Sequence, residues 1–186
     1  MVYYFNVKRV FISIPLTEVV RRQLRDLIGV LKVKMAGVHW VDPRQAHVTL
    51  RFIGEVEKSE LIALSDIVSK CTADVRPFKL EIQEFEFLPS AKRARVVALS
   101  VMENVLLDSL TAALSTRLEA FGLVPLDVQP FRPHVTIGRT RAGVLNAVQY
   151  SLIHFSATCP VHTIDIMKST LTTDGPVYTL VKQIFI

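Results

Sequence analysis

The chain has 186 residues, of which 50% are hydrophobic and 21% are charged, a composition typical of a globular protein that buries its own core. The formal net charge of +5 favours encounter with polyanions. The sequence contains neither a GxxxxGKS/T nor a GxGxxG loop, so ATP hydrolysis and dinucleotide chemistry lack their usual phosphate-binding motif. Any phosphate chemistry is therefore expected to run without a nucleotide cofactor.

Cysteine usage and the N-terminal segment indicate a cytoplasmic protein. Cys71 and Cys159 are too few and too far apart for a disulfide framework, and neither lies in a CxxC pair, which fits a reducing compartment. Lys8 and Arg9 interrupt the N-terminal apolar run, so we expect no signal peptide. The longest uncharged stretch, 142–164, contains polar residues and a proline, so we expect no membrane span.

Apolar residues recur with the periods of strands and helices along most of the chain. Alternation predicts strands at 8–14, 47–53, 78–87, 95–101, 134–137, 161–167 and 178–186. Helical spacing predicts one helix with Thr17 as its N-cap, a second capped by Ser59, and a long helix over 106–118 that ends at Gly122. The connection between the third and fourth strands is basic, and its spacing fits either a hairpin or a crossover.

Helices and strands follow one another with hairpin-like spacings, which favours an antiparallel or mixed sheet over a doubly wound parallel one. The sequence also repeats one plan, in which a helix is followed by a turn with proline and then by a strand that opens with histidine. We therefore predict an α+β fold in which residues 1–186 form a single domain of two similar lobes. Each lobe is expected to carry an antiparallel or mixed sheet with packed helices.

The repeat is sharpest at His47–Leu50 and His134–Ile137, whose sequences HVTL and HVTI lie 87 positions apart. In a strand, residues i and i+2 share a face, so each histidine is expected beside a threonine, Thr49 or Thr136, with the apolar residues on the opposite face. Each motif thus combines a proton-transfer group with a hydrogen-bond donor. Two such motifs facing each other between the lobes would surround one phosphate with two imidazoles and two hydroxyls.

This combination favours a phosphodiester site. In-line displacement at phosphorus needs a base behind the nucleophile and an acid at the leaving oxygen, and histidine serves either role near neutral pH. Arg139 follows the second motif, and a guanidinium matches phosphate geometry. A single HxT motif on a strand is more often structural, whereas two copies favour function. A zinc site is the weaker alternative because a third ligand is missing nearby, and we predict no metal.

The two motifs resemble those of the two-histidine phosphoesterases. The segments HVTLRFIGE (47–55) and PHVTIGR (133–139) are similar to the motif strands of the RNA 2′,3′-cyclic phosphodiesterase branch, historically called 2′-5′ RNA ligase. The C-terminal segments KSTL (168–171) and GPVY (175–178) are similar to the end of archaeal-looking members. The resemblance covers nearly the whole chain.

The resemblance implies a pseudo-twofold fold with a central cleft that carries both HxTx motifs. It implies hydrolysis of the 2′,3′-cyclic phosphate at an RNA end to a 2′-phosphate, without metal or nucleotide cofactor. By the same analogy His47 protonates the departing ribose O3′ and His134 activates water, with the reverse assignment left open. An ATP-independent ligase activity, in which a ribose hydroxyl replaces water, is also implied. Residues 1–7 start earlier than in the family and are interpreted as an added edge strand.

Three residues near the motifs have two interpretations each. Phe52 is suited to stacking on a base, but alternation puts it on the face opposite His47, so a core role is equally supported unless the strand bulges. Tyr178 matches the family and carries a hydroxyl suited to phosphate or ribose, whereas a buried tyrosine is the ordinary alternative. Arg132 either contacts RNA or braces the turn before His134.

Basic residues outside the motifs form two further groups. The loop with Lys92, Arg93 and Arg95 either follows the RNA backbone or is simply solvated. The other group lies on the solvent side of the first predicted helix and is interpreted as helix surface: Arg21, Arg22 and Arg25.

The primary hypothesis is an RNA-end-processing enzyme that opens 2′,3′-cyclic phosphates. Its partner would be RNA with such an end, tRNA fragments among the candidates, and we expect a monomer that needs no protein partner. One alternative is an RNA-binding module without turnover. Another is a phosphodiesterase for a small cyclic nucleotide or a 2′-5′ oligoadenylate, because the motif histidines contact only the phosphate and leave the rest of the substrate undetermined.

Overall fold

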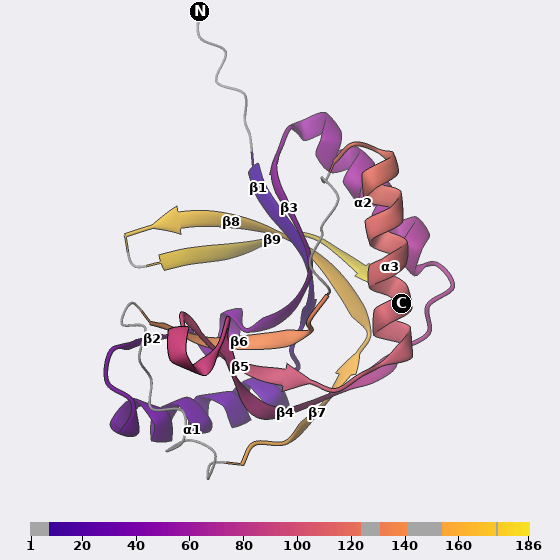
Figure 1. Cartoon of the computed structure of the whole chain (residues 1–186). Coiled ribbons are helices and arrows are strands. Elements are labelled where there is room, and N and C mark those ends of the chain that lie inside the picture. Colours follow the sequence, from indigo (N-terminus) through magenta and orange to yellow (C-terminus); the bar gives the residue numbers. More distant parts are fainter. Residues whose placement is uncertain (1–7, 124–130, 141–153, 174) are drawn as a thin grey trace, which may run out of the picture.

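The computed structural model describes residues 8–123, 131–140, 154–173 and 175–186 (Figure 1). Its strands are β1 (Lys8–Pro15), β2 (Val38–Trp40), β3 (His47–Val56), β4 (Phe78–Leu88), β5 (Val96–Val101), β6 (His134–Thr140), β7 (Ala157–Val161), β8 (Thr163–Thr172) and β9 (Gly175–Phe185). Its helices are α1 (Glu18–Lys34), α2 (Lys58–Thr72) and α3 (Val105–Ala120), with short 3₁₀ helices η1 (Pro43–Gln45) and η2 (Ala91–Arg93). The predicted α+β class is confirmed.

The strands form one sheet in the order β7-β4-β5-β6-β3-β1-β8-β9, with β2 paired to β6. Every pairing among these strands is antiparallel. The order consists of two groups of four strands, and the groups meet where β3 pairs with β6 at Val48 and Val135. The two predicted lobes correspond to these groups, and each central strand opens with a histidine motif.

The helices cover the curled sheet from two sides, with α1 on one side and α2 and α3 together on the other (Figure 1). Thr17 caps α1 as predicted, because its hydroxyl oxygen accepts a hydrogen bond from the Val20 N–H. Asn104 caps α3 in the same way. Gly122 follows α3 with φ of 72°, the left-handed conformation predicted for the C-terminal cap.

The structure corrects two expectations and settles a third. The N-cap of α2 is Glu57 and not Ser59, because the Glu57 N–H donates to the Glu60 carboxylate at 2.7 Å in a capping box. Strand β7 was not predicted, and Val161, the first residue of the predicted strand 161–167, is its last residue. Pro160 is tolerated inside β7 because β7 ends the sheet and one side of the strand needs no ladder hydrogen bond. Strands β4 and β5 form a hairpin through η2.

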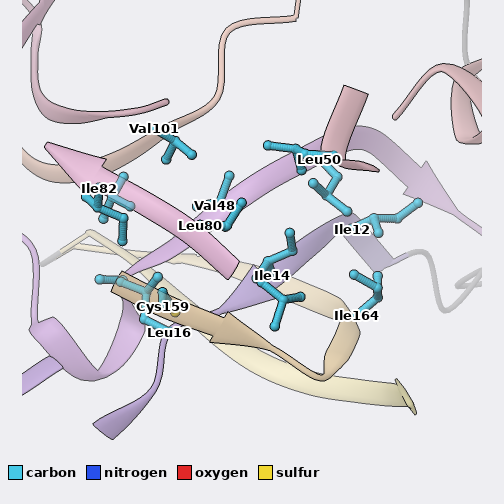
Figure 2. Packing of buried hydrophobic residues seen from close by; sticks show 14 of the residues in the cluster. Ile12, Ile14, Leu16, Val48, Leu50, Leu80, Ile82, Val101, Cys159 and Ile164 are labelled. Carbon is cyan, nitrogen blue, oxygen red and sulfur yellow. The ribbon is translucent and has the colours of Figure 1, made fainter. Parts of the chain in front are cut away.

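The core lies on one face of the motif strands. Buried side chains from β1, β3, β4 and β7 converge there, as Figure 2 shows for Ile12, Leu50 and Leu80. On the motif strands, Val48 and Val135 are completely buried in this cluster. The histidines and threonines that alternate with these residues consequently lie on the opposite face of the sheet. No helix among the described residues is long and apolar enough to span a bilayer.

A substitution at Gly138 of β6 can test how closely β2 packs against this strand. A methyl group on Gly138 would lie 2.6 Å from Val38 Cγ1 and 3.2 Å from Trp40 Cε3. We therefore expect Gly138→Ala to lower the free energy of unfolding by about 1–3 kcal/mol in urea titrations. The matched control is Gly29→Ala in α1, where a methyl group would meet no atom within 4 Å, and where stability is expected to rise by about 0.5–1 kcal/mol. Unchanged stability of Gly138→Ala would contradict this packing.

Candidate active site

Both motif histidines are held by the same backbone contact. His47 Nδ1 lies 2.7 Å from the carbonyl oxygen of Gln45, and His134 Nδ1 lies 2.8 Å from the carbonyl oxygen of Arg132. Because a carbonyl oxygen only accepts, each Nδ1 carries the hydrogen and donates it. In the neutral form of each ring, Nε2 is then the nitrogen that can accept a proton. A proline with a restricted φ precedes each histidine, Pro43 at the start of η1 and Pro133 directly before His134.

The two motifs meet at their central valines. Val48 of β3 is paired antiparallel with Val135 of β6, and both valines point into the core. Antiparallel pairing at this point puts His47 on the side of Thr136, and His134 on the side of Thr49, all on the opposite face of the sheet. The sequence therefore predicted correctly which residues share a face, and the strand pairing brings the two motifs together.

An aromatic cluster surrounds His47. The Phe11 ring stacks on the imidazole with centroids 4.8 Å apart, and the Tyr178 ring meets it edge-on at 5.1 Å. Phe11 is completely buried and also contacts Tyr178 edge-on. Sequence reasoning missed Phe11, although a signal was present: alternation in β1 puts Phe11 on the face opposite Val10 and Ile12, which is the face that carries the motif histidines.

Burial gives His47 an unusual protonation equilibrium. Desolvation lowers the pKa of His47, the hydrogen bond to the Gln45 carbonyl raises it, and the positive charges of His134 and Arg139 lower it further. The net effect is a lowered pKa, so the neutral imidazole persists to a lower pH than in an unfolded chain.

Phe52 lies on the same side of the sheet as His47. Strand β3 has one extra residue relative to β1 between Thr49 and Arg51, since these two residues pair with the adjacent residues Ser13 and Ile12. This bulge changes the alternation, and the Phe52 ring stacks on Phe11 at 5.5 Å while remaining 48% exposed. The core interpretation of Phe52 is therefore wrong.

Other predicted residues lie around the same face. Arg139 is exposed on β6 and pairs with Val96 of β5. The Arg132 guanidinium bonds the Glu86 carboxylate, with Nε 2.8 Å from Oε1, so Arg132 braces the turn before His134. Arg95 lines a cavity of about 1180 Å³ beside His134, which Thr49 and Phe52 also line.

Arg21 departs from its interpretation as helix surface. Its side chain is half-buried, and its Nε is buried without a hydrogen-bond partner, whereas Arg22 and Arg25 are exposed. Arg21 also lines a small niche beside His47. The helical pattern did not distinguish the three arginines, because only the packing of α1 beside η1 brings Arg21 toward the site.

Within the described ranges, no group of three or more histidine, cysteine, aspartate or glutamate side chains lies close enough together to hold a metal ion. The predicted site residues on this face instead carry imidazole, hydroxyl and guanidinium groups. They suit an anion that exchanges protons at two sites.

Comparisons with known proteins agree with this picture. A family model described as LigT-like phosphoesterase matches residues 14–98. A curated relative from Thermus thermophilus, named RNA 2′,3′-cyclic phosphodiesterase, is 30% identical over 183 residues, which cover 94% of this chain and 88% of the relative. One of the same name from Aquifex aeolicus is 29% identical over 182 residues, covering 95% of this chain and 94% of the relative.

Solved structures share the fold. A crystal structure of a Thermus thermophilus protein superimposes with a TM-score of 0.79 at 26% identity, covering 95% of this chain and 97% of that one. The apo form of E. coli LigT gives a TM-score of 0.77 at 23% identity, covering 97% and 98%. Fold and sequence together define an enzyme of the phosphoesterase class. The chain belongs to the LigT-like phosphoesterase family, which confirms the resemblance seen in its two HxTx motifs.

The lowered pKa of His47 predicts how stability depends on pH. Because the folded pKa lies below the unfolded value of about 6.5, the unfolded chain binds more protons between these two values. His47 therefore contributes a loss of stability as the pH falls from about 6.5 toward the folded pKa, and no loss above that range. Urea midpoints measured at several pH values for the parent and His47→Gln test this. Identical pH dependence in both proteins would contradict it.

Proposed function

We propose that this protein hydrolyses the 2′,3′-cyclic phosphate at the end of an RNA strand to a 2′-phosphate and a free 3′-hydroxyl. The observation that carries the proposal is the pairing of the two HxT motifs at Val48 and Val135, with Nδ1 of each histidine held by a carbonyl and Nε2 left for the substrate. Curated relatives that match most of the chain carry the name of this activity.

In this proposal a water oxygen attacks phosphorus in line with O3′ while the Nε2 of one histidine takes the water proton. The P–O3′ bond then breaks, and the second histidine donates its Nε2 proton to O3′. The hydroxyls of Thr49 and Thr136 donate hydrogen bonds to the non-bridging oxygens. The positive charge of Arg139 stabilises the negative charge that develops on these oxygens.

The two histidines have different surroundings, which bears on their roles. The family resemblance implies His47 as the acid and His134 as the base. Burial of His47 favours the reverse, because a lowered pKa keeps its imidazole neutral, and the neutral form is the one that accepts a proton. We therefore assign His47 as the base and His134 as the acid.

Two aromatic side chains would hold the terminal nucleotide. Phe52 stacks on Phe11, and the Arg9 guanidinium lies 5.6 Å from the centroid of its ring. The side chain stays 48% exposed, so the exposed part of the ring is where a base would stack, next to the Arg9 charge. The Tyr178 ring contacts His47 edge-on, and its hydroxyl is suited to a ribose or phosphate oxygen. The basic loop with Arg95 lies at the same cavity as Phe52, which supports a contact with the RNA backbone.

We further propose that the reaction needs no metal and no nucleotide cofactor, since side chains supply the acid, the base and the positive charge. ATP-independent 2′-5′ ligation would be the same displacement with a ribose hydroxyl in place of water. Hydrolysis should dominate it, because water is present at bulk concentration. A monomeric, single-domain enzyme of the cytoplasm, acting on RNA ends such as those of tRNA fragments, stays a prediction.

The proposal is tested with a short RNA that carries a 2′,3′-cyclic phosphate, incubated in EDTA with the parent, His47→Ala and His134→Ala. The parent is expected to produce a 2′-phosphate with a bell-shaped pH profile. Each substitution is expected to lower kcat by roughly 10²- to 10⁴-fold, because it removes a proton-transfer group. A 3′-phosphate product, or dependence of the rate on a divalent ion, would refute the proposed mechanism.

Failure of turnover by a folded parent would separate the alternatives. RNA binding that survives both substitutions would favour a binding module. Turnover of a cyclic mononucleotide or a 2′-5′ oligoadenylate, with none of RNA, would favour a small-molecule phosphodiesterase.

An activated substrate distinguishes the roles of the two histidines. In a p-nitrophenyl phosphodiester, the leaving group is p-nitrophenolate, which departs without receiving a proton from an acid. With this substrate His134→Ala should keep most of the parent activity, while His47→Ala should lose about as much as on RNA. Release of p-nitrophenolate measures both rates. The opposite pattern would support the assignment implied by the resemblance.

A further inference from the structure

A small niche of about 60 Å³ opens directly beside His47. Its walls come from α1, η1 and the strands β1, β8 and β9, and they include Ser13, Arg21, Arg44 and Tyr178. On this scale a single water needs about 10–15 Å³. The niche is therefore large enough for several waters or for one group the size of a phosphate.

The Nε of Arg21 is buried in this niche without a hydrogen-bond partner among the described residues. The Arg21 side chain as a whole is half-buried. A guanidinium that is partly removed from water without an ion pair is costly. An anion bound in the niche would remove this cost, and a phosphate oxygen is the partner that a guanidinium matches best.

The rest of the niche also suits an anion. Arg44 contributes a second guanidinium, which is held by Asp42 through contacts of 2.6 Å to 3.1 Å and is otherwise largely exposed. Ser13 and Tyr178 contribute hydroxyls, which donate readily to phosphate oxygens. Among the described residues, no carboxylate lines the niche. The hydrogen bonds and the positive charge of Arg44 lower the pKa of Asp42. Burial raises the pKa of Asp165, while the Gln183 hydrogen bond and the Arg21 charge partly offset this rise.

We propose that this niche is a second phosphate subsite, in which Arg21, assisted by Arg44, binds the internucleotide phosphate next to the reacting end of the RNA. The inference rests on the proposed function, because it takes the cyclic phosphate to lie between His47 and His134. The niche shares His47 and Tyr178 with that site. The next phosphate along the strand is therefore the nearest second anion that the substrate carries.

A structural role for Arg21 is the competing explanation. Asp165 is buried, its Oδ1 accepts a hydrogen bond of 3.0 Å from Gln183, and the Arg21 charge acts on it. If Arg21 served only to balance Asp165, its loss would weaken the fold and affect every substrate alike. A subsite for the second phosphate instead predicts an effect that depends on the substrate.

The test combines three variants with three substrates. The variants are Arg21→Gln, Arg21→Lys and Arg22→Gln, the last being an exposed arginine of the same helix that loses the same charge. The substrates are a nucleoside 2′,3′-cyclic phosphate, a dinucleotide with the same cyclic end, and that dinucleotide with an uncharged methylphosphonate linkage. For each combination of variant and substrate, kcat/KM is measured. The Kd of the corresponding 2′-phosphate product is measured as well, because this binding measurement requires no turnover.

Arg21→Gln is expected to lower kcat/KM and product affinity for the charged dinucleotide by roughly 10- to 100-fold, the value of a charge-assisted hydrogen bond. For the nucleoside cyclic phosphate and for the methylphosphonate dinucleotide, Arg21→Gln should leave kcat/KM and product affinity nearly unchanged. Arg21→Lys should restore part of the loss, and Arg22→Gln should have little effect on any of the three substrates.

Three results would overturn the subsite. Equal losses on all substrates, with a lowered Tm, would show a structural role. Weaker binding of inorganic phosphate to Arg21→Gln, without discrimination between the two dinucleotides, would show that free phosphate and not RNA is the ligand. Unchanged values throughout would show that Arg21 binds neither. An inactive parent that still binds the charged dinucleotide product through Arg21 would refute the proposed function and retain the subsite.

Discussion

The antiparallel contact between β3 and β6 at Val48 and Val135 determines where the motif histidines and threonines lie. Both valines are completely buried, so this register is enforced by the core. Because side chains alternate along a strand, a slip by one residue in either strand would bury a histidine and expose a valine. Burial of the two valines thus determines on which face of the sheet the neighbouring histidines and threonines lie.

The two motifs are nearly identical in sequence, yet their surroundings differ. Each histidine is oriented by a carbonyl two residues earlier, which is a consequence of the shared local sequence. The aromatic rings of Phe11 and Tyr178 contact His47 and not His134. The reason is that β1 and β9 belong to the group of strands that contains β3. The strands that flank each motif therefore give two nearly identical motifs different surroundings.

Local patterns predicted the elements and the faces of the motif strands well. Alternation assigned β1, β3 and β6, and helical spacing assigned α1 and α3, since these signals depend on neighbouring residues. Features that depend on contacts between distant segments were not accessible in this way. The bulge that turns Phe52 toward the site depends on how β3 pairs with β1, and the burial of Arg21 depends on how α1 packs. The proline in β7 is acceptable only because β7 ends the sheet.

The strand order also constrains how the protein can fold as it is synthesised. The group that contains His47 consists of β1 and β3 from the start of the chain and β8 and β9 from its end. Arg9 of β1, for example, pairs with Ser169 of β8. A nascent chain that has emerged only as far as β7 lacks two of these four strands and leaves one edge of β1 unpaired. The half that contains the half-buried His47 is therefore completed last, through contacts of long sequence separation that slow folding.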